Sequence, residues 1–267
     1  MTPLDTLLPL FGVAAYFLGA LAVFQIRLWL GHPLEDAEVS ERPASIVLGR
    51  YWRHYMMWVL SPFERLLARL HVSPSAITFA SLVAAVGSAL CLSRGRFGAG
   101  GWLYLVTGML DILDGRVARA TGRVSRAGAF FDSVIDRYAE LAVLSGLAIY
   151  YRDRWVLAVA LAAAVGSVMV SYVRARGEAL GVDVKVGTMQ RPERLFYLGL
   201  MVCQSPAWEA LFPSVGKTLF APAVAALLLL GASANVTALR RIRHTLRALD
   251  PRGPDHIPCV AEERPSS

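Results

Sequence analysis

The fold is decided by Asp111-Ile-Leu-Asp114-Gly115-Arg-Val-Ala118-Arg119 and, after eight further residues, by Gly128-Ala-Phe-Phe-Asp132-Ser-Val-Ile-Asp136. In each segment the aspartates are three or four residues apart, so they lie on one face of a helix. A helical hairpin would bring all four carboxylates together. Acidic groups at membrane depth are costly and usually mark a functional site. This stretch therefore predicts a helical hairpin whose carboxylates bind divalent cations.

Composition predicts an all-α, polytopic membrane protein. Hydrophobic residues make up 55% of the 267 residues, charged residues make up 18%, and the mean hydropathy is +0.48. This balance excludes an ordinary soluble domain. Apolar stretches long enough, or nearly so, to cross a bilayer are Leu7–Ile26, Ala76–Leu92, Phe97–Leu113, Gly128–Tyr151, Trp155–Val173, Leu195–Phe212 and Thr218–Leu239. We therefore expect six core helices and one extra N-terminal helix.

Four regions are expected along the chain. Residues 1–30 contain the extra transmembrane helix, and 31–72 form a cytoplasmic linker followed by an amphipathic helix at the membrane surface. Residues 73–249 form the catalytic membrane domain, and 250–267 form a disordered cytoplasmic tail. A cleaved signal peptide is the alternative for the first segment. The charge order disfavours it, because no Lys or Arg precedes the apolar run and Arg27 follows it.

The distribution of basic residues predicts the orientation, since cytoplasmic loops are enriched in Lys and Arg. With 31–75 in the cytoplasm, the external loops hold only five of the 27 basic residues: Arg94, Arg96, Arg152, Arg154 and Lys217. This topology places the aspartates near the cytoplasmic face of the cell membrane and the N-terminus outside.

The aspartate spacing, D-x-x-D-G-x-x-A-R followed by G-x-x-x-D-x-x-x-D, resembles the signature of the CDP-alcohol phosphotransferases. These membrane enzymes join a CDP-linked lipid to an alcohol and release CMP. All eight signature positions match, and the resemblance extends from about Ser73 to about Arg243. The resemblance implies a CDP-diacylglycerol substrate and a homodimer in the membrane lipid. No motif indicates a nucleic-acid partner.

The chemistry of pyrophosphate cleavage suits these residues. Hard cations such as Mg2+ or Mn2+ prefer oxygen ligands, and two of them can neutralise a pyrophosphate. Asp111, Asp114 and Asp132 are the expected ligands. By resemblance, Asp136 is the base that accepts the proton of the attacking hydroxyl and also contacts a metal. The alternative is a structural ion-pair network with the neighbouring arginines, namely Arg116, Arg119, Arg123, Arg126 and Arg137.

Several other signature residues are expected to contact the CDP-lipid. Gly115 and Ala118 are small and share a helix side with Asp114, so they leave room for a nucleotide, although small residues also serve helix packing in membranes. Arg119 could contact the nucleotide phosphate or pair with an aspartate. By resemblance, Gly128 and Thr78, which lies in a Pro-x-x-x-Thr sequence, complete this group.

Basic residues in the second half predict a phosphorylated acceptor, because guanidinium groups match phosphate oxygens. Ser-Tyr-Val-Arg-Ala-Arg at 171–176 and Gln-Arg-Pro-Glu-Arg-Leu at 190–195 resemble the bacterial phosphatidylinositol phosphate synthases. That resemblance assigns Ser171, Arg174 and Arg194 to an inositol phosphate pocket, with Arg241 as a further contact. Cytoplasmic enrichment in arginine explains any one of them equally well. The chain departs from the subfamily at Arg174, where lysine is common.

Three alternatives remain from the sequence. The first is the same chemistry on glycerol 3-phosphate, which the basic residues do not exclude. The second is a membrane scaffold or lipid-binding protein without catalysis, which four retained acids argue against. The third is a transporter, which is disfavoured because no paired broken helices mark a substrate site in the middle of the membrane.

Overall fold

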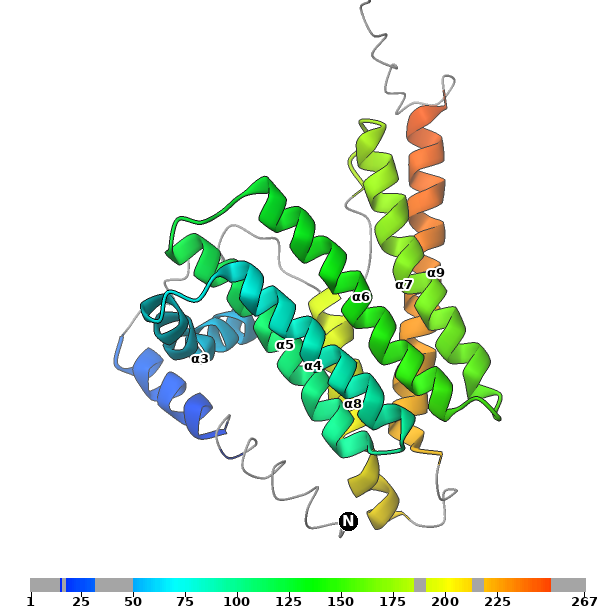
Figure 1. Ribbon diagram of the computed structural model, residues 1–267, viewed down its shortest axis with the longest axis horizontal. Coiled ribbons are helices and arrows are strands. Elements are labelled where there is room, and N and C mark those ends of the chain that lie inside the picture. The colour runs from blue at the N-terminus through cyan, green and yellow to red at the C-terminus, as the bar shows by residue number, and fades with distance from the viewer. Residues whose placement is uncertain (1–14, 16–17, 32–49, 185–190, 213–218, 251–267) are drawn as a thin grey trace, which may run out of the picture.

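A computed structural model describes residues 15, 18–31, 50–184, 191–212 and 219–250. All regular secondary structure within these ranges is helical (Figure 1). The helices are Leu18–Trp29, α3 (Arg50–Arg69), α4 (Pro74–Ser93), α5 (Phe97–Ala120), α6 (Arg126–Tyr150), α7 (Val156–Ala179), α8 (Arg191–Leu211) and α9 (Ala221–Leu249). The predicted all-α fold is confirmed.

The helices extend beyond the apolar stretches from which they were predicted. α5 continues from Leu113 to Ala120, and α9 continues about ten residues past Leu239 to Leu249. The added residues are mostly Ala, Arg and Leu, which favour helix as strongly as the apolar spans do. The C-terminal ends of α5, α7 and α9 lie on one side of the molecule. α4, α6 and α8 begin on the same side. The charged extensions therefore gather there.

A short turn joins α5 to α6 and forms the predicted hairpin. Gly122 has a φ of +65°, and the backbone N–H of Arg123 donates to the carbonyl of Ala118, which is the usual way for a helix to end at glycine. Ser125 then caps α6, because its hydroxyl accepts the backbone N–H of Gly128 at 3.0 Å. The local sequence between the two aspartate pairs therefore reverses the chain.

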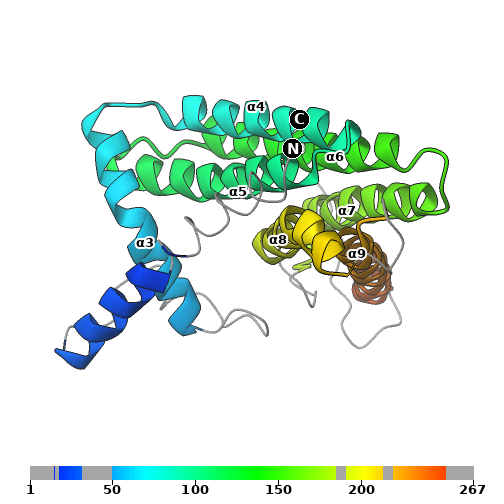
Figure 2. The same cartoon turned by 90° about the horizontal axis from the view of Figure 1, so that it is seen from below.

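α4 packs along both arms of this hairpin, α5 packs on α8, and α7 packs on α9. Figure 1 shows α7 and α9 running side by side, and Figure 2 shows α3 leading away from the layer formed by α4, α5 and α6. The largest buried cluster includes Leu92, Phe97, Tyr104, Leu144, Leu147, Leu198 and Leu227. Its members come from α4 to α9, so these helices share one core.

Two glycines allow helices to approach closely. A Cβ on Gly146 of α6 would lie 2.5 Å from the carbonyl oxygen of Ala89 on α4, and a Cβ on Gly101 of α5 would lie 2.4 Å from the backbone nitrogen of Cys203 on α8. Both neighbours are backbone atoms, so the helices themselves would have to separate. Small residues at such contacts are the rule for helices packed in membranes.

We expect Gly146→Ala to destabilise the protein by about 1–3 kcal/mol, because one methyl group must push α4 and α6 apart. A thermal unfolding scan in detergent would measure the lower Tm. Gly87→Ala on α4 is the matched control, since its Cβ would meet only Leu103 at 3.5 Å, an ordinary contact. An unchanged Tm for Gly146→Ala would contradict the tight contact between α4 and α6.

Three described helices, α4, α7 and α9, are long and apolar enough to cross a membrane. α5, α6 and α8 have 24, 25 and 21 residues, which is sufficient length, but they carry the charged residues of the predicted sites. The described N-terminal helix is Leu18–Trp29, so the first part of the expected span Leu7–Ile26 lies outside the described residues. So do most of the expected linker (32–49) and all but the first residue of the expected tail (251–267).

Candidate metal centre and substrate site

Three of the four signature aspartates form one cluster. One carboxylate oxygen from each of Asp111, Asp132 and Asp136 lies within 4.8 Å of the others. Asp111 lies in the second half of α5, and the other two lie in the first half of α6, so the hairpin brings them together. Asp136 is buried and the other two are half-buried. The predicted convergence of the two segments is confirmed for these three residues.

Asp114, the fourth aspartate, is buried beside this cluster and interacts electrostatically with Asp132 and Asp111. The hydroxyl of Thr78 on α4 donates to Asp114 Oδ2 at 2.6 Å. Thr78 is itself buried, and its hydroxyl also lies 3.1 Å from the carbonyl of Pro74 at the start of α4. The Thr78 hydroxyl is thus directed at a carboxylate, and α4 fixes the orientation of Asp114.

The cluster has the donor chemistry that a divalent cation needs. Its ligating atoms are all carboxylate oxygens, which suit Mg2+ and Mn2+. Like charges so close together are unfavourable without a cation between them. Among the arginines of the alternative ion-pair network, Arg116 pairs with Glu64 on α3, and Arg137 lies 3.4 Å from Asp136. The residues present therefore fit a metal centre.

The predicted nucleotide-binding residues border the aspartates. A Cβ built on Gly115 would first meet the guanidinium of Arg119, at 3.4 Å, so Gly115 and Arg119 occupy adjacent space on α5. Arg119 is exposed, whereas Gly115 and Ala118 are half-buried. Gly128 lies in the first turn of α6. These four residues surround the turn between the two aspartate pairs.

The predicted acceptor residues come together from three helices. Arg241 of α9 interacts electrostatically with Arg174 of α7 and Arg194 of α8, and it donates to the carbonyl of Val170 at 2.7 Å. Arg174 is exposed and pairs with Glu178 at 2.8 Å. The hydroxyl of Ser171 lies 3.4 Å from the carbonyl of Ser167, one turn earlier on α7. The three arginines therefore lie near one another where α7, α8 and α9 meet.

Arg194 differs from the other two arginines because it is buried in a polar network. Its Nη1 donates to Ser167 Oγ at 3.2 Å, and Ser167 Oγ donates to Glu140 Oε1 at 2.7 Å. Arg194 Nη2 lies 3.8 Å from the same Glu140 oxygen. All three side chains are at least nine-tenths buried. Glu140 and Ser167 were not identified from the sequence. The available signal was Glu140, an acid one turn after Asp136 inside an apolar stretch.

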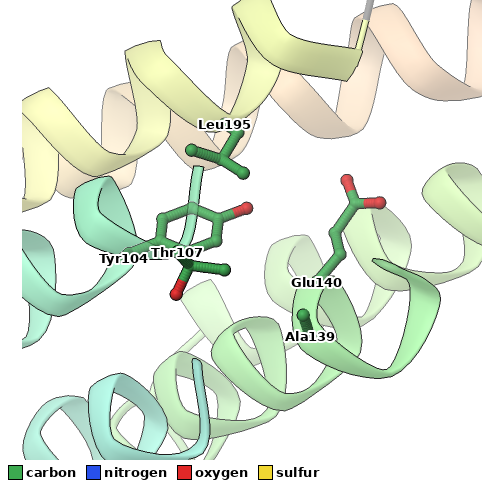
Figure 3. Close-up of a pocket in the computed structure, with 5 residues that line it drawn as sticks. All are labelled: Tyr104, Thr107, Ala139, Glu140 and Leu195. Atoms are coloured by element: carbon green, nitrogen blue, oxygen red, sulfur yellow. The ribbon is translucent and has the colours of Figure 1, made fainter. Parts of the chain in front are cut away.

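A small cavity adjoins this network. It is lined by Tyr104, Thr107, Ala139, Glu140 and Leu195, and it is too narrow to hold a water molecule. Figure 3 shows the Glu140 side chain extending from α6, with its carboxylate pointing away from Ala139. This cavity is therefore not a substrate pocket, although it borders Glu140.

The comparisons with known proteins agree on one family. The family model described as CDP-alcohol phosphatidyltransferase matches residues 71–232. The phosphatidylinositol phosphate synthase of Cutibacterium acnes is 38% identical over 143 residues, covering 51% of this chain and 69% of that protein. The enzyme of that name from Streptomyces avermitilis is 36% identical over 174 residues, covering 62% of this chain and 71% of that protein.

Solved structures of the phosphatidylinositol phosphate synthase of Mycobacterium tuberculosis share the fold at 29% sequence identity. The crystal structure with CDP-DAG bound aligns with a TM-score of 0.61 and covers 74% of this chain and 97% of that chain. The complex with manganese and citrate aligns with a TM-score of 0.62 and covers 74% of this chain and 92% of that chain. The likeness thus extends over nearly the whole of the mycobacterial protein.

Proposed function

Because this chain belongs to the CDP-alcohol phosphatidyltransferase family, we propose that it transfers the phosphatidyl group of CDP-diacylglycerol to inositol phosphate, with release of CMP. The observation that carries the proposal is the pairing of an aspartate cluster on α5 and α6 with an arginine group on α7, α8 and α9. The first suits a pyrophosphate with its metal ions, and the second suits the phosphate of an acceptor.

Asp111, Asp114, Asp132 and Asp136 would hold Mg2+ or Mn2+ in a two-metal site. When bound, such ions neutralise the pyrophosphate and stabilise the leaving phosphate. Asp114 contributes from a fixed position, because Thr78 holds its carboxylate. The mycobacterial relative crystallised with manganese supports this assignment.

Asp136 would act as the general base. Its carboxylate accepts the proton of the acceptor hydroxyl as that oxygen attacks the phosphorus attached to diacylglycerol. The bond from this phosphorus to the bridging oxygen of the pyrophosphate breaks, and CMP leaves with the electron pair. Asp136 suits the role because it is the most deeply buried of the three clustered aspartates and lies on the α6 side that also carries Glu140.

The remaining residues would bind the two substrates. Gly115, Ala118, Arg119 and Gly128 would contact the CDP moiety beside the aspartates, and Thr78 would act through Asp114. Arg174, Arg194 and Arg241, with Ser171, would bind the acceptor phosphate. The names of the relatives favour inositol phosphate over glycerol 3-phosphate as this acceptor.

The chain is a membrane protein, as its family and its long apolar helices indicate. For the finer arrangement we propose a homodimer in the cell membrane, with the site facing the cytoplasm and the N-terminus outside. The charge distribution supports this orientation, since the arginine-rich helix ends lie on the same side as the aspartate hairpin. Soluble inositol phosphate would then reach the site directly.

The test is CMP release by the purified protein in detergent with CDP-diacylglycerol and Mg2+ or Mn2+. Inositol phosphate, glycerol 3-phosphate, free inositol and serine would be compared as acceptors. We expect turnover with inositol phosphate alone and its loss on chelation of the metal. Turnover only with glycerol 3-phosphate would change the acceptor and keep the reaction. If no acceptor gave CMP, the proposed transferase activity would be contradicted.

We expect Thr78→Val to lower kcat by about 10- to 100-fold, the usual effect of losing a group that orients a metal ligand. Valine has nearly the same shape as threonine, but it cannot donate to Asp114. The same CMP assay measures the loss, and Thr107→Val is the control because its hydroxyl contacts only backbone carbonyls in the described residues. Full activity of Thr78→Val would show that Asp114 needs no orienting donor.

A further inference from the structure

We propose that Glu140 is a positioning residue for the acceptor, which acts by holding the guanidinium of Arg194 through a direct ion pair and through Ser167. This inference rests on the proposed function, because it assumes that Arg194 binds the acceptor phosphate. It adds two residues, on α6 and α7, that touch neither substrate in this assignment.

The network holds Arg194 from two sides. Ser167 Oγ accepts from Arg194 Nη1 at 3.2 Å and donates to Glu140 Oε1 at 2.7 Å, and Arg194 Nη2 lies 3.8 Å from the same oxygen. An arginine side chain ordinarily loses much rotamer freedom when it binds a ligand. Because Glu140 and Ser167 fix the guanidinium beforehand, that loss is already complete when phosphate arrives.

The geometry of Arg194 leaves donors for a ligand. Its Nε is buried and makes no hydrogen bond with the part of the chain that the structure describes. A buried donor without a partner is costly and rare. A phosphate oxygen would satisfy it, and the remaining positive charge of Arg174 and Arg241 lies close by.

α6 carries Asp132, Asp136 and Glu140 at intervals of four residues, so the three carboxylates form a stripe along one side of the helix. Asp132 and Asp136 belong to the metal cluster, while Glu140 pairs with Arg194. Four residues, a rise of about 6 Å along the helix, therefore separate the base from the residue that fixes the phosphate anchor. In the acceptor, phosphate and attacking hydroxyl are joined by a covalent skeleton, so this spacing would align the hydroxyl with Asp136.

If Glu140 positions Arg194, removing its charge should raise the KM for inositol phosphate, whereas an effect of charge alone should lower that KM. Neutralising a carboxylate near an anion's site strengthens anion binding by charge alone. Glu178→Gln makes this change beside Arg174, where the ion pair is exposed, and we expect the KM for inositol phosphate to fall slightly. Glu140→Gln makes the same chemical change beside Arg194, and we expect that KM to rise, because the guanidinium loses its fixed position.

The experiment is steady-state CMP release, with each substrate varied in turn. We expect Glu140→Gln to raise the KM for inositol phosphate at least about tenfold, as loss of one partner of a buried charge pair does, while the KM for CDP-diacylglycerol stays within about twofold. Ser167→Ala should raise the acceptor KM by about threefold, the effect of one neutral hydrogen bond. Ser167→Ala keeps the charges of Glu140 and Arg194, so this variant still tests the inference if Glu140→Gln does not fold.

An acceptor KM that falls or stays constant in Glu140→Gln or, should that variant not fold, in Ser167→Ala would overturn the inference, since charge alone would then account for Glu140. A loss of kcat with both KM values unchanged would also overturn it, because Glu140 would then be structural. A wild-type protein that releases no CMP with inositol phosphate would overturn the proposed function and the inference together.

Discussion

Asp136→Asn is expected to lower kcat by about a thousandfold or more while leaving the affinity for CDP-diacylglycerol nearly unchanged. Asparagine has the same shape as aspartate but cannot accept the proton of the attacking hydroxyl, and a positioned base commonly contributes a factor of 10²–10⁴. In the proposed assignment, Gly115, Arg119 and the other acids bind the CDP-lipid, and this substitution leaves them in place. Single-turnover CMP release and direct binding of the CDP-lipid would measure the two quantities separately.

An exposed aspartate outside the cluster is a suitable control for the buried Asp136. Its carboxylate is buried on α6 and lies 3.4 Å from Arg137. Asp153, in the loop between α6 and α7, is exposed and pairs with its neighbour Arg152. Asp153→Asn should therefore keep full activity. Equal losses of CDP-lipid binding and turnover in Asp136→Asn would show that Asp136 acts chiefly as a ligand rather than as the base.

The aspartate hairpin could be predicted from the sequence because its signals are local. Spacing places the acids on one face, Gly122 ends α5, and Ser125 starts α6. The association of Thr78 with Asp114 was not predicted, since it depends on how α4 packs against α5. Contact of Thr78 with the CDP-lipid stays a prediction, to which the structure adds the hydrogen bond from its hydroxyl to this carboxylate.

The network of Glu140, Ser167 and Arg194 illustrates the same limit. Glu140 and Ser167 are 27 residues apart in the sequence, and so are Ser167 and Arg194. No rule of helical spacing connects residues so far apart. The apolar pattern also does not predict where the helices end. α7 continues to Ala179 through charged residues that favour helix. Long-range packing therefore determines which buried charges meet, while hydropathy determines only that the helices exist.

Asp111→Asn is expected to weaken Mn2+ binding by more than about tenfold and to lower turnover at low metal concentration. Asp111 is one of the three clustered acids, and an amide oxygen is a poorer ligand than a carboxylate for a hard cation. Electron paramagnetic resonance of free Mn2+ would measure the affinity directly in the purified protein.

The two aspartate variants should differ in their response to added metal. High Mn2+ should restore much of the turnover of Asp111→Asn, because mass action refills a weakened site. It should not restore Asp136→Asn, because saturation with metal does not replace a proton acceptor. If high Mn2+ rescued both variants equally, Asp136 would be a ligand only, and the base would have to be sought elsewhere. If it rescued neither while Mn2+ binding was normal, Asp111 would act on the substrate and not on the metal.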